Sequence, residues 1–236
     1  MPISRDRYED EHGRFYRVPD WLMTQYGRKG EVLWLPPVST IDDMVAKPNL
    51  KYWYGAHGTE LANQMRDEAA QIGTDAHSAI ERICSGEHIT APEWDKYPEQ
   101  VKNSIRAFLR WMQEVRYQPF TTELTVYSLK YGYAGTLDGL GYIQYNGKPM
   151  FILADWKTSG RFYKVMFLQL AAYRQAYRET YGEHKIHECR CVRLDKDTGI
   201  PEEHILAGTE ITRAFRAFCS ILYAWKYLKG DIFSGA

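Results

Sequence analysis

Long apolar runs, secretory features and cysteine patterns are all missing from this 236-residue sequence. Its longest apolar stretches, such as residues 150–154, fall far short of the roughly 20 residues that a membrane-spanning helix requires. Charged residues near the N-terminus are not followed by an apolar stretch, so no secretory signal is expected there. We therefore expect a soluble, cytoplasmic protein with no membrane partner.

The four cysteines form neither a CxxC pair nor the dense pattern of a disulfide-stabilised domain. Reduced and mostly buried thiols are the expected state, and a zinc site is not expected. The residues concerned are Cys84, Cys189, Cys191 and Cys219.

Net charge is also absent, because 30 basic side chains balance 30 acidic ones. Charge alone gives no sign of a polyanionic partner, although a cluster of carboxylates can offset a local basic rim. An apolar fraction of 44% with 14% aromatic residues is typical of a folded globular chain. The length suits one α/β domain, which we expect at residues 51–236, with residues 1–50 as an irregular arm packed on its core.

Hydrophobic periodicity predicts helices and strands beyond this arm. Apolar residues recur every three or four positions in segments that we expect to be helical: residues 52–83, with Leu61 and Met65 in the apolar stripe and Gly73 as a break or bend, 98–115, 163–181 and 212–228. Strands are expected at residues 123–129, 133–145, 150–156 and 186–194. A short helix should also begin at Ser39 or Thr40, either of which suits an N-cap. This order favours a mixed central sheet flanked by helices.

Two carboxylates and a lysine are predicted to meet on two neighbouring strands. Asn146-Gly147 is the preferred two-residue hairpin turn, so the strands on either side should pair antiparallel. Asp138 lies about eight residues before this turn and Asp155 about eight after it, which sets the two side chains opposite each other. Lys157 leaves the same face as Asp155, because side chains two apart in a strand share a face.

This arrangement suits phosphodiester hydrolysis. Hard carboxylate oxygens hold Mg²⁺ or Mn²⁺, which polarises a phosphate and lowers the pKa of a water molecule. A lysine beside the carboxylates can orient that water or neutralise developing negative charge. The alternative is an ordinary exposed acid and base at a strand end, which leaves the second acid on the partner strand unexplained.

Three motifs resemble, in order and spacing, the G-x-x-D, D-x-K-T-S and Q-x-x-x-Y motifs of RecB-like nucleases in the PD-(D/E)XK superfamily. They lie at residues 135–138, 155–159 and 169–173. Residues 73–81 resemble the upstream histidine helix of that branch. The resemblance covers roughly residues 36–195 and implies an α/β, restriction-endonuclease-like core.

The resemblance also implies roles for individual residues. The histidine and acids that match His77, Asp138 and Asp155 are metal ligands in the family, and the lysine that matches Lys157 is catalytic together with the two acids. Without the other motifs, His77 would be interpreted as a capping or core histidine on an apolar helix.

Four further side chains have two interpretations each. Gln169 and Tyr173 share a helix face, which in the family points toward the active site and contacts DNA or supports the lysine; the alternative is packing of the helix on the sheet. Glu123 matches a strand position that is often acidic in the family, yet an alternating strand also needs outward polar residues. Glu81, one turn after His77, either orients the imidazole or is solvated.

Some relatives hold an iron–sulfur cluster with one cysteine upstream of the histidine and three closely spaced ones near the C-terminus. The cysteines here lack that spacing, so no iron–sulfur cluster is expected. Residues 37–40 and 47–50, with Trp53, are similar to the N-terminal region of phage exonucleases and of the mitochondrial genome maintenance exonuclease.

The sequence thus predicts an Mg²⁺- or Mn²⁺-dependent deoxyribonuclease, an exonuclease that acts on DNA ends in replication, recombination or phage DNA processing. The alternatives are a structure-specific or flap endonuclease with the same site, and a catalytically silent nucleic-acid-binding module. The arm contains the rings and cations of a single-strand channel, with simple packing as the alternative: Trp21, Tyr26, Trp34, Tyr52, Trp53 and Tyr54, with Arg28, Lys29 and Lys51. Single-stranded DNA, or DNA with a free end, is therefore the expected partner.

Overall fold

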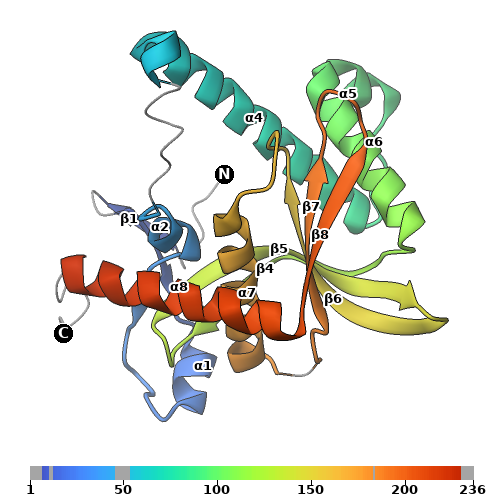
Figure 1. The fold of residues 1–236 in the computed structure, drawn as a ribbon. Coiled ribbons are helices and arrows are strands. Elements are labelled where there is room, and N and C mark those ends of the chain that lie inside the picture. The colour runs from blue at the N-terminus through green and yellow to red at the C-terminus, as the bar shows by residue number, and fades with distance from the viewer. Residues whose placement is uncertain (1–6, 11–12, 46–53, 183, 230–236) are drawn as a thin grey trace.

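The computed structural model describes residues 7–10, 13–45, 54–182 and 184–229. A five-stranded mixed sheet lies at the centre, and helices cover both of its faces (Figure 1). The main helices are α2 (Val38–Asp42), α4 (Thr59–Cys84), α5 (Ala91–Lys96), α6 (Glu99–Glu114), α7 (Lys164–Thr180) and α8 (Gly208–Lys229). The expectation of a mixed sheet flanked by helices is confirmed.

The central sheet has the strand order β4-β5-β6-β7-β8. Strands β6 and β7 are parallel, whereas the other neighbours are antiparallel. The periodicity missed β8, because most of its residues are exposed or half-buried and several are polar, so that this edge strand carries little hydrophobic alternation. The strands are β4 (Gln118–Ser128), β5 (Tyr133–Tyr145), β6 (Lys148–Lys157), β7 (Glu188–Leu194) and β8 (Pro201–Ala207).

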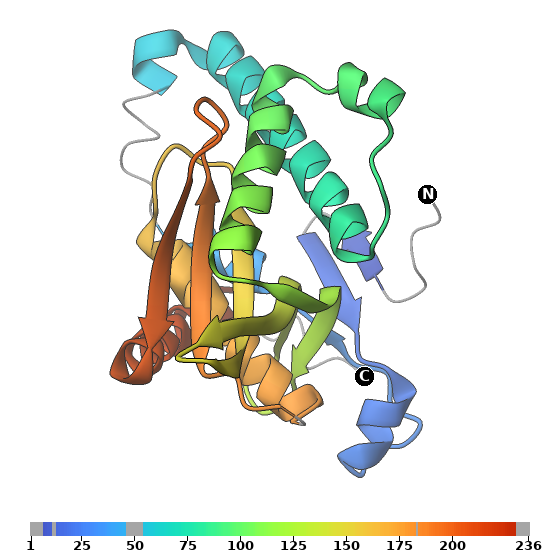
Figure 2. The ribbon, with the colours of Figure 1, turned by 90° about the vertical axis from the view of Figure 1, so that its right-hand side faces the viewer.

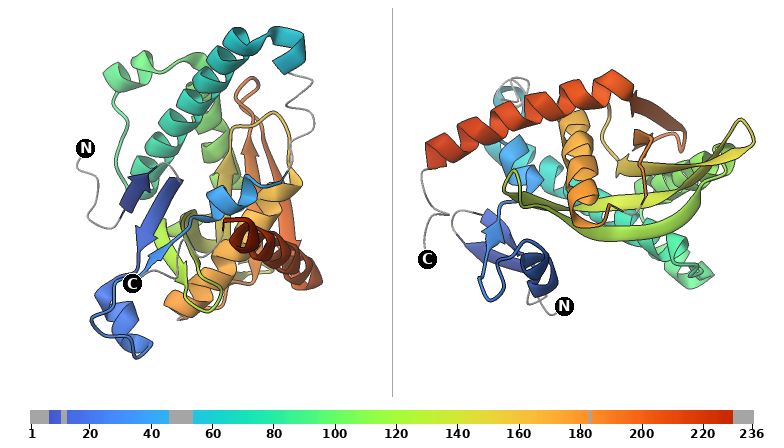
Figure 3. Two further views of the ribbon diagram at one scale, coloured as in Figure 1. Left: turned by 90° about the vertical axis from the view of Figure 1, so that its left-hand side faces the viewer. Right: turned by 90° about the horizontal axis from the view of Figure 1, so that it is seen from below.

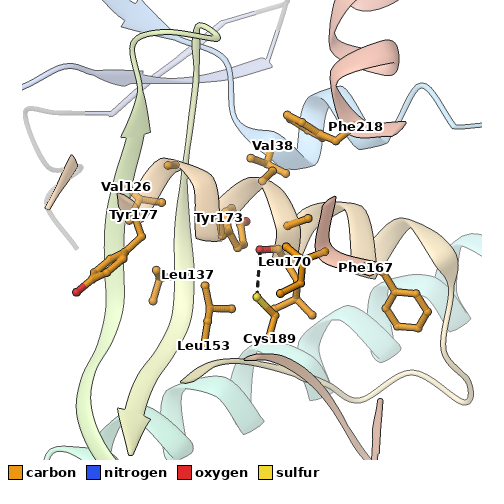
Figure 4. Close-up of a cluster of buried hydrophobic side chains, with 14 of the residues drawn as sticks. Val38, Val126, Leu137, Leu153, Phe167, Leu170, Tyr173, Tyr177, Cys189 and Phe218 are labelled. Carbon is orange, nitrogen blue, oxygen red and sulfur yellow. Dashed lines mark hydrogen bonds between the residues drawn. The ribbon is translucent and has the colours of Figure 1, made fainter. Parts of the chain in front are cut away.

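Helices α7 and α8 cover one face of the sheet. Seen from below, α8, α7 and the curved sheet lie in successive layers (Figure 3). Leu170 and Tyr173 of α7 lie in one buried cluster with Leu137 and Leu153 of the strands, and Phe218 of α8 closes its outer side (Figure 4). Burial of each leucine contributes roughly 1.5–3 kcal/mol, so this cluster fixes α7 on the sheet.

Helices α4 and α6 cover the opposite face (Figure 2). Ile80 of α4 and Phe108 of α6 belong to a second buried cluster, which includes Trp156 of β6. The Phe108 and Trp156 rings meet edge to face, with centroids 5.3 Å apart. Trp156 therefore faces away from its neighbours Asp155 and Lys157, as alternation along a strand requires.

Two details of α4 differ from the sequence prediction. The helix runs through Gly73 without a break. Leu61 and Met65, assigned to its apolar stripe, are 49% and 39% exposed, because the N-terminal half of α4 projects beyond the sheet (Figure 1). None of the helices in the described ranges combines enough length and apolarity to cross a membrane.

The N-terminal segment is not an irregular arm. It forms a three-stranded antiparallel sheet and a short helix, whose strands of two to five residues are too short to give a periodic signal. Tyr16 and Leu22 of this segment pack against Tyr127 and Ala134 of the central sheet. The elements are β1 (Arg7–Asp10), β2 (Gly13–Arg17), α1 (Asp20–Gln25) and β3 (Trp34–Leu35).

The N-cap predicted for the next helix was also wrong. Helix α2 begins at Val38 with Pro37 as its N-cap, and no side chain caps it. Pro37 has an extended backbone with ψ 149° and forms a bridge with Ala134 of β5. This tertiary contact sets the N-cap two to three residues earlier than the predicted Ser39 or Thr40.

Gly139 of β5 provides a test of the contact that holds Trp156. A Cβ at this position would overlap the Trp156 ring, which is fully enclosed. Gly139→Ala should therefore destabilise the protein by about 1–3 kcal/mol, the usual cost of overpacking a core, in urea unfolding. Gly160→Ala is the matched control, since no atom lies within 4 Å of its added Cβ. Equal stability of the two variants would contradict this packing.

Candidate functional site

Asp138 and Asp155 lie on the neighbouring strands β5 and β6, just beyond the last residues that pair. The pairing of the two strands extends to Gly139 and Ala154, and the same register continued by one residue joins the two acids. The backbone N–H of Trp156 donates a hydrogen bond to Asp138 Oδ2 at 2.9 Å, which orients that carboxylate. The structure thus brings together the two acids that the hairpin turn predicts.

Asp155 forms an ion pair with Lys157. Lys157 Nζ lies 2.7 Å from Asp155 Oδ2, and Asp155 Oδ1 is buried without a hydrogen-bond partner in the part of the chain that the structure describes. Burial raises the pKa of Asp155 to about 6, against the opposing effect of the Lys157 charge and with reinforcement from Asp138. Burial lowers the pKa of Lys157, but the two acids outweigh it and the net shift is upward. Lys157 is therefore a cation at neutral pH.

His77 reaches the acids from α4. Its Nε2 lies 2.8 Å from the carbonyl oxygen of Trp156, and its Nδ1 lies 3.7 Å from Asp138 Oδ2. Because a carbonyl oxygen only accepts hydrogen bonds, Nε2 carries the hydrogen, and the neutral ring then has its lone pair on Nδ1. This nitrogen is on the side of Asp138 and suits a metal ion.

Gly73 brings α4 close to the end of β6. A Cβ on Gly73 would lie 3.4 Å from Thr158 Oγ1, so a larger side chain would press on the residue that follows Lys157. Gly73 is one helical turn before His77. The close approach of helix and strand end therefore sets the distance from which His77 reaches Asp138.

Glu123 of β4 completes a group of three side chains that could hold a metal ion. One ligand atom from each of His77, Glu123 and Asp138 lies within 4.8 Å of the others. The pairing of β4 with β5 skips Glu123, whose φ of 50° is uncommon for a residue other than glycine. Backbone strain of this kind clusters at functional positions. Two carboxylates and an imidazole, with the buried Asp155 Oδ1 on the neighbouring strand, form a donor set that fits Mg²⁺ or Mn²⁺.

Gln169 and Tyr173 contact each other on α7. Gln169 Nε2 donates to the Tyr173 hydroxyl oxygen at 2.9 Å. Burial raises the pKa of Tyr173 well above its ordinary value, and the charge of Asp155 raises it further. A Cβ on Gly135 would overlap the Tyr173 ring, so glycine at this position lets α7 approach β5. The pair thus packs on the sheet and also lies beside the acids.

Tyr16 and the backbone of Trp156 belong to the surroundings of the site, and sequence reasoning missed both. The Tyr16 hydroxyl lies 3.2 Å from Thr136 Oγ1, two residues before Asp138 on β5. Tyr16 is in the N-terminal sheet and far from every motif, so only the tertiary packing identifies it. The carbonyl of Trp156 carries no signal because sequence motifs describe side chains.

Glu81 and Trp21 do not belong to the group formed by His77, Glu123 and Asp138. The Glu81 side chain is exposed, and the described residues show no contact between it and His77, whose Nε2 meets Trp156 instead. Trp21 is 50% exposed and its ring lies 6.2 Å from that of Tyr181, at the opposite end of α7 from Lys164. Tyr52, Trp53 and Lys51 lie outside the described residues, and the single-strand channel of the arm stays a prediction.

The raised pKa of Asp155 predicts how the metal-free protein responds to pH. A carboxyl whose pKa is about 6 in the folded state and 3.8 when unfolded contributes stability below pH 3.8, and that stability is lost as the pH rises through about 6. In EDTA, the free energy of unfolding of the wild type should therefore fall between these pH values by on the order of 1–3 kcal/mol more than that of Asp155→Asn.

Asp195→Asn is the control for this measurement, because hydrogen bonds from backbone N–H groups lower the pKa of Asp195 to about 2 and its effect lies below pH 3.8. Urea titrations at several pH values compare the three proteins. An Asp155→Asn profile parallel to that of the wild type would show that Asp155 is not buried in this way.

No family model matches the chain, and no curated protein matches it either. Among solved structures, an alkaline exonuclease from Laribacter hongkongensis matches with 15% sequence identity and a TM-score of 0.35, over 83% of this chain and 91% of that one. A TM-score this low establishes no common fold, so the function has to be inferred from the residues of the site.

Proposed function

We propose that this protein is a divalent-metal-dependent deoxyribonuclease with a PD-(D/E)XK core. The observation that carries the proposal is the convergence of His77, Glu123 and Asp138 within 4.8 Å, beside the buried ion pair of Asp155 and Lys157. Metal ligands next to a fixed cation suit the metal-assisted hydrolysis of a phosphodiester. The resemblance of the three sequence motifs to RecB-like nucleases supports the same conclusion.

His77 through Nδ1, Glu123 and Asp138 would hold the cation. The resemblance adds Asp155, whose Oδ1 is not the oxygen that contacts Lys157. A bound Mg²⁺ or Mn²⁺ supplies Lewis acidity toward a phosphate oxygen and toward the attacking water. The Trp156 N–H orients Asp138, and the Trp156 carbonyl holds the imidazole. The backbone of one residue therefore positions two of the ligands.

Lys157 acts as a fixed positive charge. Its raised pKa keeps the amine protonated, so it can donate a hydrogen bond or neutralise charge on the phosphate but cannot accept the proton of the water. Tyr173 also keeps its proton at neutral pH, and Gln169 holds its hydroxyl. Lys157 and Tyr173 are therefore both hydrogen-bond donors to an anionic substrate.

Exonuclease action on DNA ends is the favoured mode, on the resemblance of residues 37–53 to phage exonucleases. A structure-specific or flap endonuclease is the alternative, since both modes use the same chemistry and differ in how the substrate reaches it. A catalytically silent binding module would place clustered negative charge against phosphates without a purpose.

End-labelled linear DNA, closed single-stranded circles and duplex, each with Mg²⁺, Mn²⁺ or EDTA, test the proposal. Linear strands should be degraded with either metal and remain intact in EDTA, while circles resist. Asp138→Asn should lower the rate by more than about 100-fold, beyond the cost of losing a residue that only orients a ligand. Asp197→Asn, an exposed acid in the β7–β8 turn, should behave as the wild type. Cleavage that survives EDTA or Asp138→Asn refutes the proposal, and rapid cutting of circles replaces the exonuclease with the endonuclease.

Lys157→Gln separates charge stabilisation from metal binding. The variant should lose about 100- to 1000-fold in single-turnover rate, the scale seen when a group that stabilises transition-state charge is removed. Its Mn²⁺ affinity in a calorimetric titration should be kept, because Lys157 contacts Asp155 through Oδ2 and leaves Oδ1 for the cation. Lys148→Gln, at the other end of the same strand, is the control. Loss of Mn²⁺ binding in Lys157→Gln alone would contradict this role.

A further inference from the structure

The segment between β6 and α7, residues 158–163, connects Lys157 to the helix that carries Gln169 and Tyr173. Its first residue, Thr158, lies against Gly73 of α4. Two views show the segment at the end of the sheet from which α4 projects (Figures 1 and 2). A polymer whose reacting phosphate lies beside Lys157 therefore has this segment within reach.

Phe162 anchors the segment on the protein. Its ring lies 6.3 Å from that of Phe167 and 6.2 Å from that of His204, and these two rings stack at 4.2 Å with an interplanar angle of 16°. The hydroxyl of Ser159 donates to the carbonyl oxygen of Arg161 at 2.9 Å and braces the turn before Phe162. These contacts place Phe162 and the turn before it against the body of the protein.

The outer side of the segment carries a ring and two cations. Tyr163 is 44% exposed, and the Arg161 guanidinium lies 5.0 Å from the centroid of its ring. Lys164, the first residue of α7, has its amine 5.4 Å from the Phe167 ring. Arg161 and Lys164 are both exposed, and in the described ranges neither forms an ion pair with a carboxylate. His204, whose ring stacks on that of Phe167, has its Nε2 3.1 Å from a carboxylate oxygen of Glu210.

We propose that Arg161, Tyr163 and Lys164 form the surface that binds a DNA single strand next to the active site. The inference rests on the proposed nuclease function and deepens it. The two cations contact phosphates, and the exposed face of Tyr163 stacks on a base, which is tolerant of sequence. A duplex keeps its bases paired and stacked on one another, so a surface ring has no free base to stack on. The surface therefore selects single strands.

Fluorescence anisotropy of a labelled single-stranded oligonucleotide in EDTA measures binding without turnover. Tyr163→Ala should weaken binding about 5- to 150-fold, the effect expected when one stacked base loses its ring. Tyr163→Phe should retain the wild-type affinity, because the ring face makes the contact. Wild-type affinity in Tyr163→Ala would overturn the stacking contact.

The salt dependence of binding tests the two cations separately. Removing two phosphate contacts to a single strand should make the slope of log affinity against log salt shallower by about 1.4, since each contact contributes about 0.7. The double variant Arg161→Gln with Lys164→Gln should show this change, whereas Tyr163→Ala should keep the wild-type slope. An unchanged slope in the double variant would overturn the phosphate contacts.

Tyr145→Ala and Lys148→Gln, at the strand residues on either side of the β5–β6 turn, are matched controls. Both residues are exposed, and they lie at the opposite end of β6 from Lys157, about 30 Å away at 3.3 Å per residue. They should bind as the wild type does, and an equal loss of affinity in these controls would overturn the location of the surface. A wild-type protein that neither binds nor cleaves DNA refutes the proposed function itself. If the wild type cleaves DNA and the variants of Arg161, Tyr163 and Lys164 all bind as it does, only this surface is refuted.

Discussion

The register of β5 against β6 is the constraint on which the site depends. Asn146 and Gly147 both have positive φ, as a tight two-residue hairpin turn requires, and the pairing that starts there runs to Gly139 and Ala154, the neighbours of Asp138 and Asp155. A slip of one residue would exchange the faces of β6, so that Trp156 would point toward α7 and Lys157 toward α6. Packing of the Trp156 ring in the cluster under α6 opposes such a slip, and core packing therefore protects the geometry of the groups that we propose to be catalytic.

Burial and the charge of Lys157 have opposite effects on the ionisation of Asp155. Asp155 is fully enclosed, which would favour its neutral form, and the ion pair with Lys157 offsets part of that cost. Asp138 and Glu123, the latter at a position of strained backbone, bring further carboxylates within 4.8 Å of a ligand atom of His77. A divalent ion is the charge that this arrangement would accommodate, so we interpret the strain and the buried carboxylate as features of a site built to bind one.

Most of the fold could be predicted because its central elements have strong local signals. The stripe of α6 and the apolar run of β6 follow from periodicity, and the hairpin turn follows from Asn146 and Gly147. The local sequence signals failed where an element is short or depends on tertiary contacts. Strand β8 is an edge strand with several polar residues, and the N-terminal strands are short. Pro37, the N-cap residue of α2, is placed by its bridge with β5. The juxtaposition of Asp138 with Asp155 could be inferred by counting from the turn. The part played by Tyr16 and by the Trp156 carbonyl could not, because neither the packing of a remote segment nor a backbone atom leaves a motif.

The central claim is that a divalent cation binds between α4, β4 and β5, beside the Asp155–Lys157 pair. The most direct measurement is the anomalous scattering of Mn²⁺ in crystals of the protein. The account predicts a single strong peak at bonding distance, about 2.0–2.3 Å, from His77 Nδ1 and a carboxylate oxygen of Asp138. Crystals that bind Mn²⁺ elsewhere, with no peak between these two residues, would contradict it.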